Sequence, residues 1–179
     1  MGSSHHFSLL KQIEFAKPVH SLAFSNLNNH LALGGDEGVL YVLSVPSRSM
    51  ILNTILGSPI NSLSFSKHDE FLAVGTKDGT VSLMSPANNY ETVAGIENSE
   101  AAVTAQDWSS RNFAVGRQDG TFALYETHKI QNKLFVPQLE FDQRKAIRSV
   151  SFGASGRFLG KFSQLIDYRR LSMIQRTLS

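Results

Sequence analysis

Cysteine is absent from this chain of 179 residues, so disulfide bonds, thiolate metal sites and cysteine nucleophiles are all excluded. A chain without cysteine agrees with a reducing compartment, and we expect the protein to be cytoplasmic. Long apolar runs are also missing: none approaches the length of a membrane span, and no signal peptide is visible. Apart from the pair His5 and His6, the histidines show no metal-ligand spacing.

Signatures of catalysis and of cofactor binding are scarce too. The chain lacks the Gly-x-x-x-x-Gly-Lys-Ser/Thr loop that cradles phosphates. Asp69 and Glu70 are adjacent carboxylates, but neighbouring side chains in a strand or turn usually diverge, which disfavours joint acid–base catalysis. We therefore predict no enzyme activity, no catalytic residues, no cofactor and no metal site.

What the chain does contain is a repeated unit, seen most clearly over residues 59–85 (PINSLSFSKHDEFLAVGTKDGTVSLMS). The unit recurs once upstream and twice downstream, the last time incompletely. Its aromatic residues lie 41, 43 and 44 residues apart and are Phe24, Phe65, Trp108 and Phe152. Self-similarity with a period in the low forties, made of short strands, is the signature of a four-stranded propeller blade.

Each unit predicts a series of short strands. Apolar residues alternate with serines over 62–66, as in a strand with one buried face, and 71–75 is a nearly continuous apolar run suited to a strand packed on both sides. A hairpin signal follows, and then a further strand over 80–84. The turn residues of the three complete units are Glu37 and Gly38, Asp78 and Gly79, and Asp119 and Gly120. We expect the glycines to take positive φ and the acidic side chains to accept local backbone hydrogen bonds rather than to bind a partner.

These units resemble the repeats of the WD-repeat β-propeller family. The matching pieces are Phe65-Ser66, Leu72-Ala73-Val74-Gly75 and Asp78-Gly79-Thr80-Val81, with Trp108-Ser109, Ala114-Val115-Gly116 and Asp119-Gly120-Thr121 behaving likewise. The resemblance covers residues 8–160 and implies an all-β fold, an incomplete β-propeller of four-stranded antiparallel blades. It also implies a non-enzymatic scaffold that assembles other proteins. The Trp-Asp dipeptide that names the family is replaced by Leu43-Ser44, Met84-Ser85 and Tyr125-Glu126, which argues against the hydrogen-bonded tetrad of typical blades.

The predicted blades span residues 18–56, 59–94 and 102–141, with a half blade at 146–160, and residues 1–7 look like a tail or tag. The fourth unit loses the pattern at Gly160, where no Asp-Gly turn follows. Propellers close with 4 to 8 blades, so three and a half units leave one blade face without a neighbouring blade and one strand edge unpaired. Three interpretations remain: a fragment of a longer propeller, a truncated or mis-spliced product, which the abrupt loss of pattern favours, or a half ring completed by another chain.

Charge is divided unevenly along the chain. Residues 1–143 carry a net charge of −5 and residues 144–179 a net charge of +7. Within the basic tail, 161–179, apolar residues lie near helical spacing with arginines between them. A basic amphipathic helix could bind nucleic acid or an anionic membrane, which is the alternative function. The competing interpretation, sequence outside the pattern with no evolved role, is favoured on composition.

A partner is expected at one rim of the propeller, where strand entrances and hairpins come together. Polar residues that differ between units occupy both places while their flanking residues stay constant, as on a shared scaffold that presents distinct contacts. The predicted partner-binding residues are His20, Asn61, Thr104 and Arg148 at the strand entrances, and Lys77, Arg117 and Gln118 at the hairpins. For each residue taken singly, simple solvation explains its polarity equally well.

Overall fold

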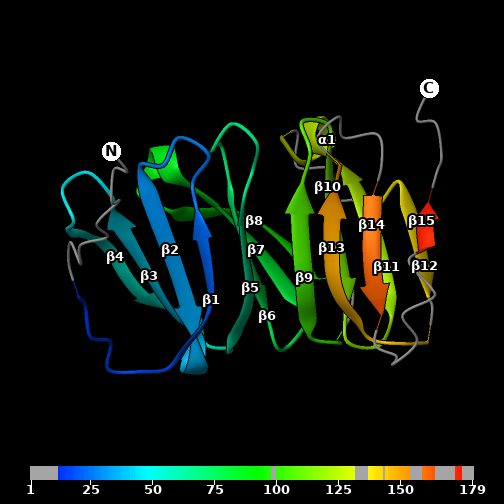
Figure 1. Cartoon of the computed structure of the whole chain (residues 1–179), viewed down its shortest axis with the longest axis horizontal. Coiled ribbons are helices and arrows are strands. Elements are labelled where there is room, and N and C mark those ends of the chain that lie inside the picture. Colours follow the sequence, from blue (N-terminus) through cyan, green and yellow to red (C-terminus); the bar gives the residue numbers. More distant parts are fainter. Residues whose placement is uncertain are drawn as a thin grey trace, which may run out of the picture.

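The described residues form four antiparallel sheets that follow one another in sequence order (Figure 1). The computed structural model describes residues 12–97, 100–131, 137–142, 144–153, 159–163 and 172–174. Three of the sheets have four strands and the last has three. The prediction of an all-β incomplete propeller is therefore confirmed, and we call the sheets blades 1 to 4. Among the described residues, no helix is both long and apolar enough to cross a bilayer.

Each blade is a meander in which consecutive strands pair. Blade 1 consists of β1 (Val19–Phe24), β2 (His30–Gly35), β3 (Val39–Ser44) and β4 (Met50–Ile55). Blade 2 consists of β5 (Ile60–Phe65), β6 (Leu72–Thr76), β7 (Thr80–Ser85) and β8 (Glu91–Glu97). Blade 3 consists of β9 (Val103–Trp108), β10 (Asn112–Arg117), β11 (Thr121–Glu126) and β12 (Leu139–Asp142). Blade 4 consists of β13 (Ile147–Phe152), β14 (Leu159–Ser163) and β15 (Ser172–Ile174). One-turn helices at Asp36–Gly38, Pro86–Asn88 and Thr127–Gln131 lie in the connections.

The fourth sheet extends beyond the predicted half blade. β14 continues through residue 163, and β15 pairs with it in antiparallel fashion. Both strands therefore use part of 161–179, which was expected to lie outside the propeller. A ladder needs only backbone groups, so the missing Asp-Gly turn does not prevent the pairing. The helix predicted for this tail is not found over 161–163 or 172–174, and the rest of the tail lies outside the described residues.

Apolar side chains fill the joints between successive blades. In blades 2 to 4 the aromatic position packs against the preceding blade: Phe65 against blade 1, Trp108 against blade 2 and Phe152 against blade 3. All five residues of β6 and all six of β10 are buried, as predicted for strands packed on both sides. Each large apolar side chain buried in this way contributes about 1.5–3 kcal/mol of transfer free energy, so the joints hold the arc together.

Close approach of the blades requires glycine on the second strand. A Cβ on Gly75 would lie 2.5 Å from Cγ1 of Val103 in the next blade. A Cβ on Gly116 would lie 2.5 Å from Cγ2 of Ile147. Gly34 meets Ile60 in the same way. The regular spacing of these glycines is therefore set by packing between sheets, since even a methyl group would push the next blade away.

Candidate functional site

Two kinds of segment lie together at one rim of the arc. One is the hairpin between the second and third strands of blades 1 to 3, and the other is the start of the first strand of each blade, which we call the inner strand. The backbone nitrogen of Lys77 donates to the carbonyl oxygen of Pro59 at 2.9 Å, and that of Gln118 donates to Ala102 at 2.9 Å. Each bond ties a hairpin to the connection that enters the same blade. We call this surface the hairpin rim; it comprises residues 36–38, 77–79 and 118–120 with residues 18–20, 59–61, 102–104 and 146–148.

The hairpins have the geometry of tight glycine turns. Gly79 and Gly120 have φ values of 91° and 97°, a region that side chains strongly disfavour. Asp78 Oδ1 accepts hydrogen bonds from the hydroxyl of Thr76 at 2.6 Å and from the backbone nitrogen of Thr80 at 3.1 Å. These donors lower the pKa of Asp78, with the Thr76 hydroxyl as the main cause. The acidic side chain therefore shapes the turn.

The four residues predicted at the strand entrances all occupy the same irregular position. In blade 1, Val19 pairs with Gly35 and Ser21 with Gly34, so the register skips the residue between them. Blades 2, 3 and 4 have equivalent shifts between 60 and 62, 103 and 105, and 147 and 149. The skipped residues are His20, Asn61, Thr104 and Arg148. A bulge residue is left out of the ladder and its side chain is re-aimed, so the sheet places little constraint on its type.

The four bulge residues differ in what they contact. Nε2 of His20 lies 2.9 Å from Oδ1 of Asp36, and both side chains are half exposed. Oγ1 of Thr104 lies within hydrogen-bonding distance of the carbonyl oxygens of Gly116 and of Ile147 in blade 4. Arg148 is exposed and Asn61 is half-buried. Thr104 thus joins blade 3 to blade 4, whereas the other three present polar groups near the solvent.

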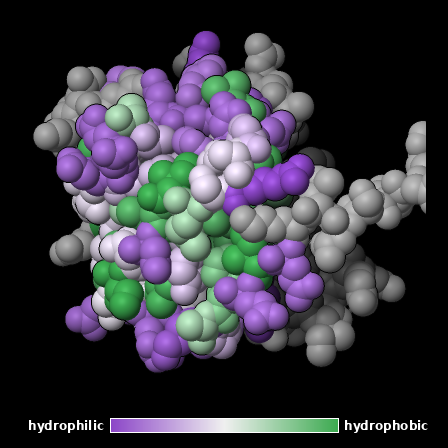
Figure 2. Space-filling view, turned by 90° about the vertical axis from the view of Figure 1, so that its left-hand side faces the viewer, coloured by the Kyte–Doolittle hydropathy of each residue, from purple (hydrophilic) through white to green (hydrophobic). Residues whose placement is uncertain are grey.

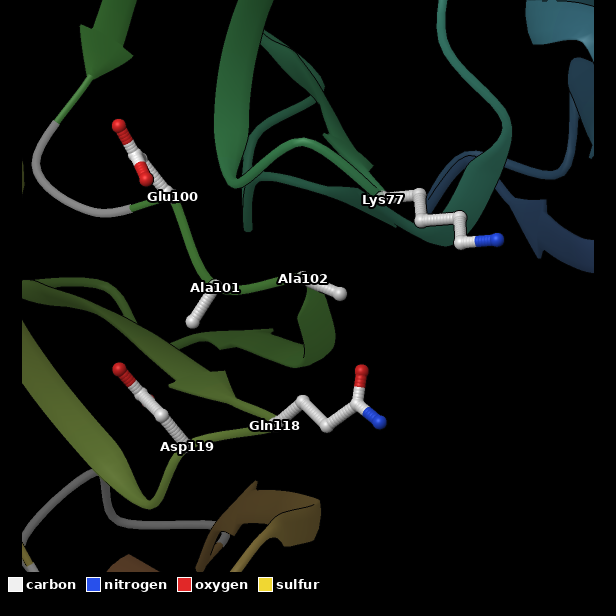
Figure 3. Close-up of a pocket in the computed structure, with 6 residues that line it drawn as sticks. All are labelled: Lys77, Glu100, Ala101, Ala102, Gln118 and Asp119. Carbon is white, nitrogen blue, oxygen red and sulfur yellow. The ribbon is translucent and has the colours of Figure 1, made fainter.

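An open, shallow cavity of about 330 Å³ lies on the hairpin rim between blades 2 and 3 (Figure 3). Its lining includes Lys77 and Gln118, two of the predicted binding residues, together with Glu100, Ala101, Ala102 and Asp119. In Figure 3 the two carboxylates lie on one side of the alanines, while Lys77 and Gln118 extend on the other side. The cavity therefore has an apolar middle between a negative side and a side with a cation and an amide. Glu100 and Ala101 are not among the residues predicted from the sequence, because both lie in the connection between blades 2 and 3, outside the repeated pattern.

Arg117 departs from the expectation of an exposed hairpin residue. Its side chain is completely buried, at 0% exposed. It follows Phe113 and Val115 at intervals of two along β10, and both of these pack in the core between blades 2 and 3. Its three guanidinium nitrogens have no hydrogen-bond partner among the described residues. Arg117 is therefore not part of the accessible rim.

The described residues contain no arrangement suited to metal binding: no group of three His, Asp or Glu side chains could hold an ion there. The carboxylate of Asp69 is engaged across the joint between blades 1 and 2. Its oxygens accept hydrogen bonds from the backbone nitrogens of Asn26 at 2.7 Å and Leu27 at 2.9 Å. Asp69 therefore binds the loop of the neighbouring blade.

Comparison with known proteins identifies the type of fold. The family model described as the anaphase-promoting complex subunit 4 WD40 domain matches residues 22–111. The computationally designed Ika4 protein is similar in structure, with a TM-score of 0.73 and 19% identity over 89% of this chain and 93% of that chain. The β-propeller domain of Cps50 (Swd1) from Myceliophteria thermophila has a TM-score of 0.66 and 12% identity over 84% of this chain. The match covers 51% of that propeller chain, or about half its length. No curated protein matches the chain in sequence.

Proposed function

Because the chain belongs to the family of the anaphase-promoting complex subunit 4 WD40 domain, a family of WD-repeat propellers, we propose that it is a non-enzymatic scaffold that binds another protein at the hairpin rim. WD40 propeller domains generally bind other proteins and are typically non-catalytic. The family is named after a subunit of a multiprotein complex, which fits a chain whose task is assembly.

The row of bulges carries this proposal. Four blades place a bulge at the same point of the inner strand, and the residues there are His, Asn, Thr and Arg. The residues that flank each bulge are similar in all four blades: Val or Ile precedes it, and Ser or Ala follows it. A constant frame with variable polar groups on one rim is how repeat proteins distinguish partners.

The cavity between blades 2 and 3 gives the rim a place to seat a partner side chain. Its volume of about 330 Å³ lies at the lower end of the range for small-ligand pockets, which suits one or two side chains better than a cofactor. Alanines in the middle would contact an aliphatic stem, and Glu100 and Asp119 would face a cationic group on it. We therefore propose that the partner inserts a lysine or arginine side chain of a flexible segment here.

Selection of random displayed peptides on the full chain, followed by measurement of Kd, tests the proposal. The double variant Glu100→Gln/Asp119→Asn should raise the Kd of the selected peptides by about tenfold, equivalent to ~1.4 kcal/mol, because it removes the negative charges that would face the cationic group. The control is Lys67→Ala/His68→Ala, in the exposed loop between β5 and β6 at the opposite rim. Peptides that are insensitive to the first pair, or equally sensitive to both pairs, would overturn it.

The alternative function uses the basic charge of the C-terminal segment, a net +7 over residues 144–179. Association with nucleic acid or an anionic membrane would then be electrostatic, because the described parts of the tail are strands rather than an amphipathic helix. A salt titration separates the two functions. Binding that falls steeply from low to moderate salt favours the tail, and binding that weakens only slightly, as expected for a single cationic side chain, favours the rim.

A further inference from the structure

The exposed large apolar side chains of the described residues are all located in blade 1. They lie on β1, on β4 and in the loops next to these strands: Leu22 at 62%, Phe24 at 54%, Leu27 at 70%, Val45 at 37%, Met50 at 44%, Ile51 at 42% and Ile55 at 66% exposed. Figure 2, which looks onto the blade 1 end of the arc, shows hydrophobic side chains in the middle of this surface and hydrophilic ones along its margins. Such a patch on a soluble protein marks an interaction site.

Strand register shows that Leu22, Phe24 and Met50 belong to one apolar sheet face. Paired residues of adjacent strands point to the same side of a sheet. One row crosses all four strands of blade 1 and contains Phe24, Leu31, Leu43 and Met50. The next row contains Leu22, Leu33 and Tyr41. We call these two rows the blade 1 face.

The blade 1 face has the residues of a joint between blades but is only partly covered: Leu33, Tyr41 and Leu43 are buried, whereas Leu22, Phe24 and Met50 are exposed. Phe65 and Leu63 are the counterparts of Phe24 and Leu22 in blade 2, and both are only 7% exposed because blade 1 covers them. Of the described residues outside blade 1, Ile13 and Phe15 pack against this face, and the Phe15 ring lies 4.7 Å from that of Tyr41. They leave Phe24 and Leu22 more than half exposed.

The opposite end of the arc carries the complementary side of a joint. At the joint between blades 2 and 3, Ser64 accepts a hydrogen bond from Nε1 of Trp108 at 3.1 Å. At the next joint, Asp107 takes the same position and accepts from the backbone nitrogen of Phe152 at 2.7 Å. In blade 4 this position is Ser151, which is exposed. It therefore offers an acceptor like those at the joints of blade 2 with blade 3 and of blade 3 with blade 4, with no described blade beyond it.

Size and charge favour a second copy of the chain as the missing half. The arc has four sheets and matches 51% of a β-propeller domain, so two arcs together supply the eight sheets that the largest common propellers contain. Residues 12–58, which include blade 1, have a net charge of −1, whereas residues 144–153 at the blade 4 end have +3. Closed two-fold rings are the commonest arrangement of identical chains.

We propose that the blade 1 face binds the blade 4 end of a second copy of this chain, and that two copies close one eight-bladed ring. Both joints of the pair are then equivalent, and Phe24 of each copy is covered by the strand that carries Ser151 of the other. The ring leaves the hairpin rim exposed, so the proposal can fail while rim binding stands, and the reverse.

Sedimentation equilibrium of the full chain tests closure. The expected species at micromolar concentration is a dimer with twice the 19.7 kDa mass of one chain. Leu22→Ser/Phe24→Ser should weaken the dimer by about a hundredfold, because these exposed side chains would form the centre of the joint. Circular dichroism should be unchanged. Ala87→Ser, which also places a serine at an exposed apolar position but lies in blade 2, is the control and should remain dimeric.

A second variant decides which ends meet. Ser151→Glu alters the blade 4 end alone and should also give monomers. Mixing it with Leu22→Ser/Phe24→Ser should give a heterodimer. In that heterodimer the unaltered blade 1 face of one variant meets the unaltered blade 4 end of the other, so one joint is intact. A monomeric wild-type chain would overturn the proposal. A dimer that is indifferent to Ser151→Glu, or an open series of larger species, would overturn it too.

Discussion

Blades 1 and 2 contain the same repeat and bury it very differently. Leu63 and Phe65 of blade 2 are each 7% exposed, whereas their counterparts Leu22 and Phe24 are 62% and 54% exposed. The residue types are the same, so the difference comes from the neighbours: blade 2 lies between two blades, and blade 1 has one on a single side. In a repeat fold, a residue stabilises the chain only through the next unit that covers it.

Truncation of the aromatic position gives the largest expected contrast. Phe65→Ala should destabilise the monomer by about 3–5 kcal/mol, because it leaves a cavity in a packed joint. Phe24→Ala removes a side chain that is already half in water, and should cost below about 1 kcal/mol. Urea unfolding of both variants, at a concentration where the chain is monomeric, measures the two losses. Equal losses would show that blade 1 is covered in solution by part of its own chain.

Glycine substitutions sharpen the contrast between a joint and an open surface. Gly75→Ala places a methyl group 2.5 Å from Val103 Cγ1 and should cost about 1–3 kcal/mol through overpacking. Gly95→Ala, on the outer strand β8, is the matched control because its Cβ would meet nothing within 4 Å. This control should be neutral or should stabilise by about 0.4–1 kcal/mol, since it restricts the unfolded chain. Thermal unfolding of the two variants gives the comparison, and a destabilised Gly95→Ala would contradict it.

Two tyrosines allow the same comparison for a hydrogen bond: Tyr90 lies at the joint between blades 1 and 2, and Tyr41 lies on the blade 1 face. The hydroxyl of Tyr90 in blade 2 lies 2.6 Å from Nδ1 of His30 in blade 1, and Tyr90→Phe should cost about 1 kcal/mol. Tyr41→Phe, on the blade 1 face, keeps its ring contact with Phe15 and should cost less. Urea unfolding at neutral pH measures both, and a Tyr41→Phe loss as large as that of Tyr90→Phe would contradict the assignment.

The same tyrosine has a signature at high pH. Burial, and then the negative charge of Asp69, raise the pKa of Tyr90 above its ordinary value of 10.0. The unfolded chain then loses this proton at a lower pH than the folded chain, so the contribution of Tyr90 is complete below pH 10.0 and declines as the pH rises beyond it. Stability measured from neutral to alkaline pH should fall less steeply for Tyr90→Phe than for the wild type.

The sequence was sufficient to predict the fold because the propeller is encoded locally. Alternating strands and Asp-Gly turns recur at a near-constant spacing, so blades 1 to 3 follow from short stretches alone. The sequence also indicated where the hairpin-rim residues lie along the repeat, but not their backbone conformation or their burial. The bulge at Asn61 depends on how two strands pair, and the burial of Arg117 depends on how two blades pack. Neither is a property of a single stretch of residues, and the same holds for Glu100 in the cavity.

The smallest expected effect lies in the hairpins of blades 2 and 3, which share an Asp-Gly turn but differ two residues before the acidic residue. Blade 2 has Thr76 there, whose hydroxyl donates to Asp78, whereas blade 3 has the buried Arg117. Thr76→Val should therefore move the pKa of Asp78 back toward its ordinary value of 3.8. Carbon NMR titration of the Asp78 carboxyl in both proteins measures this shift.

The consequence for stability has a definite sign. The folded pKa of Asp78 is depressed, so its contribution is present above the unfolded pKa and is lost as the pH falls through the folded value. Because the carboxyl is largely exposed, solvent screening keeps this contribution small. The acid limb of the stability curve should therefore be slightly shallower in Thr76→Val than in the wild type. Thr121→Val, which removes the hydroxyl bonded to Asp119 at 2.7 Å in the other hairpin, is the control and should leave the Asp78 titration unchanged.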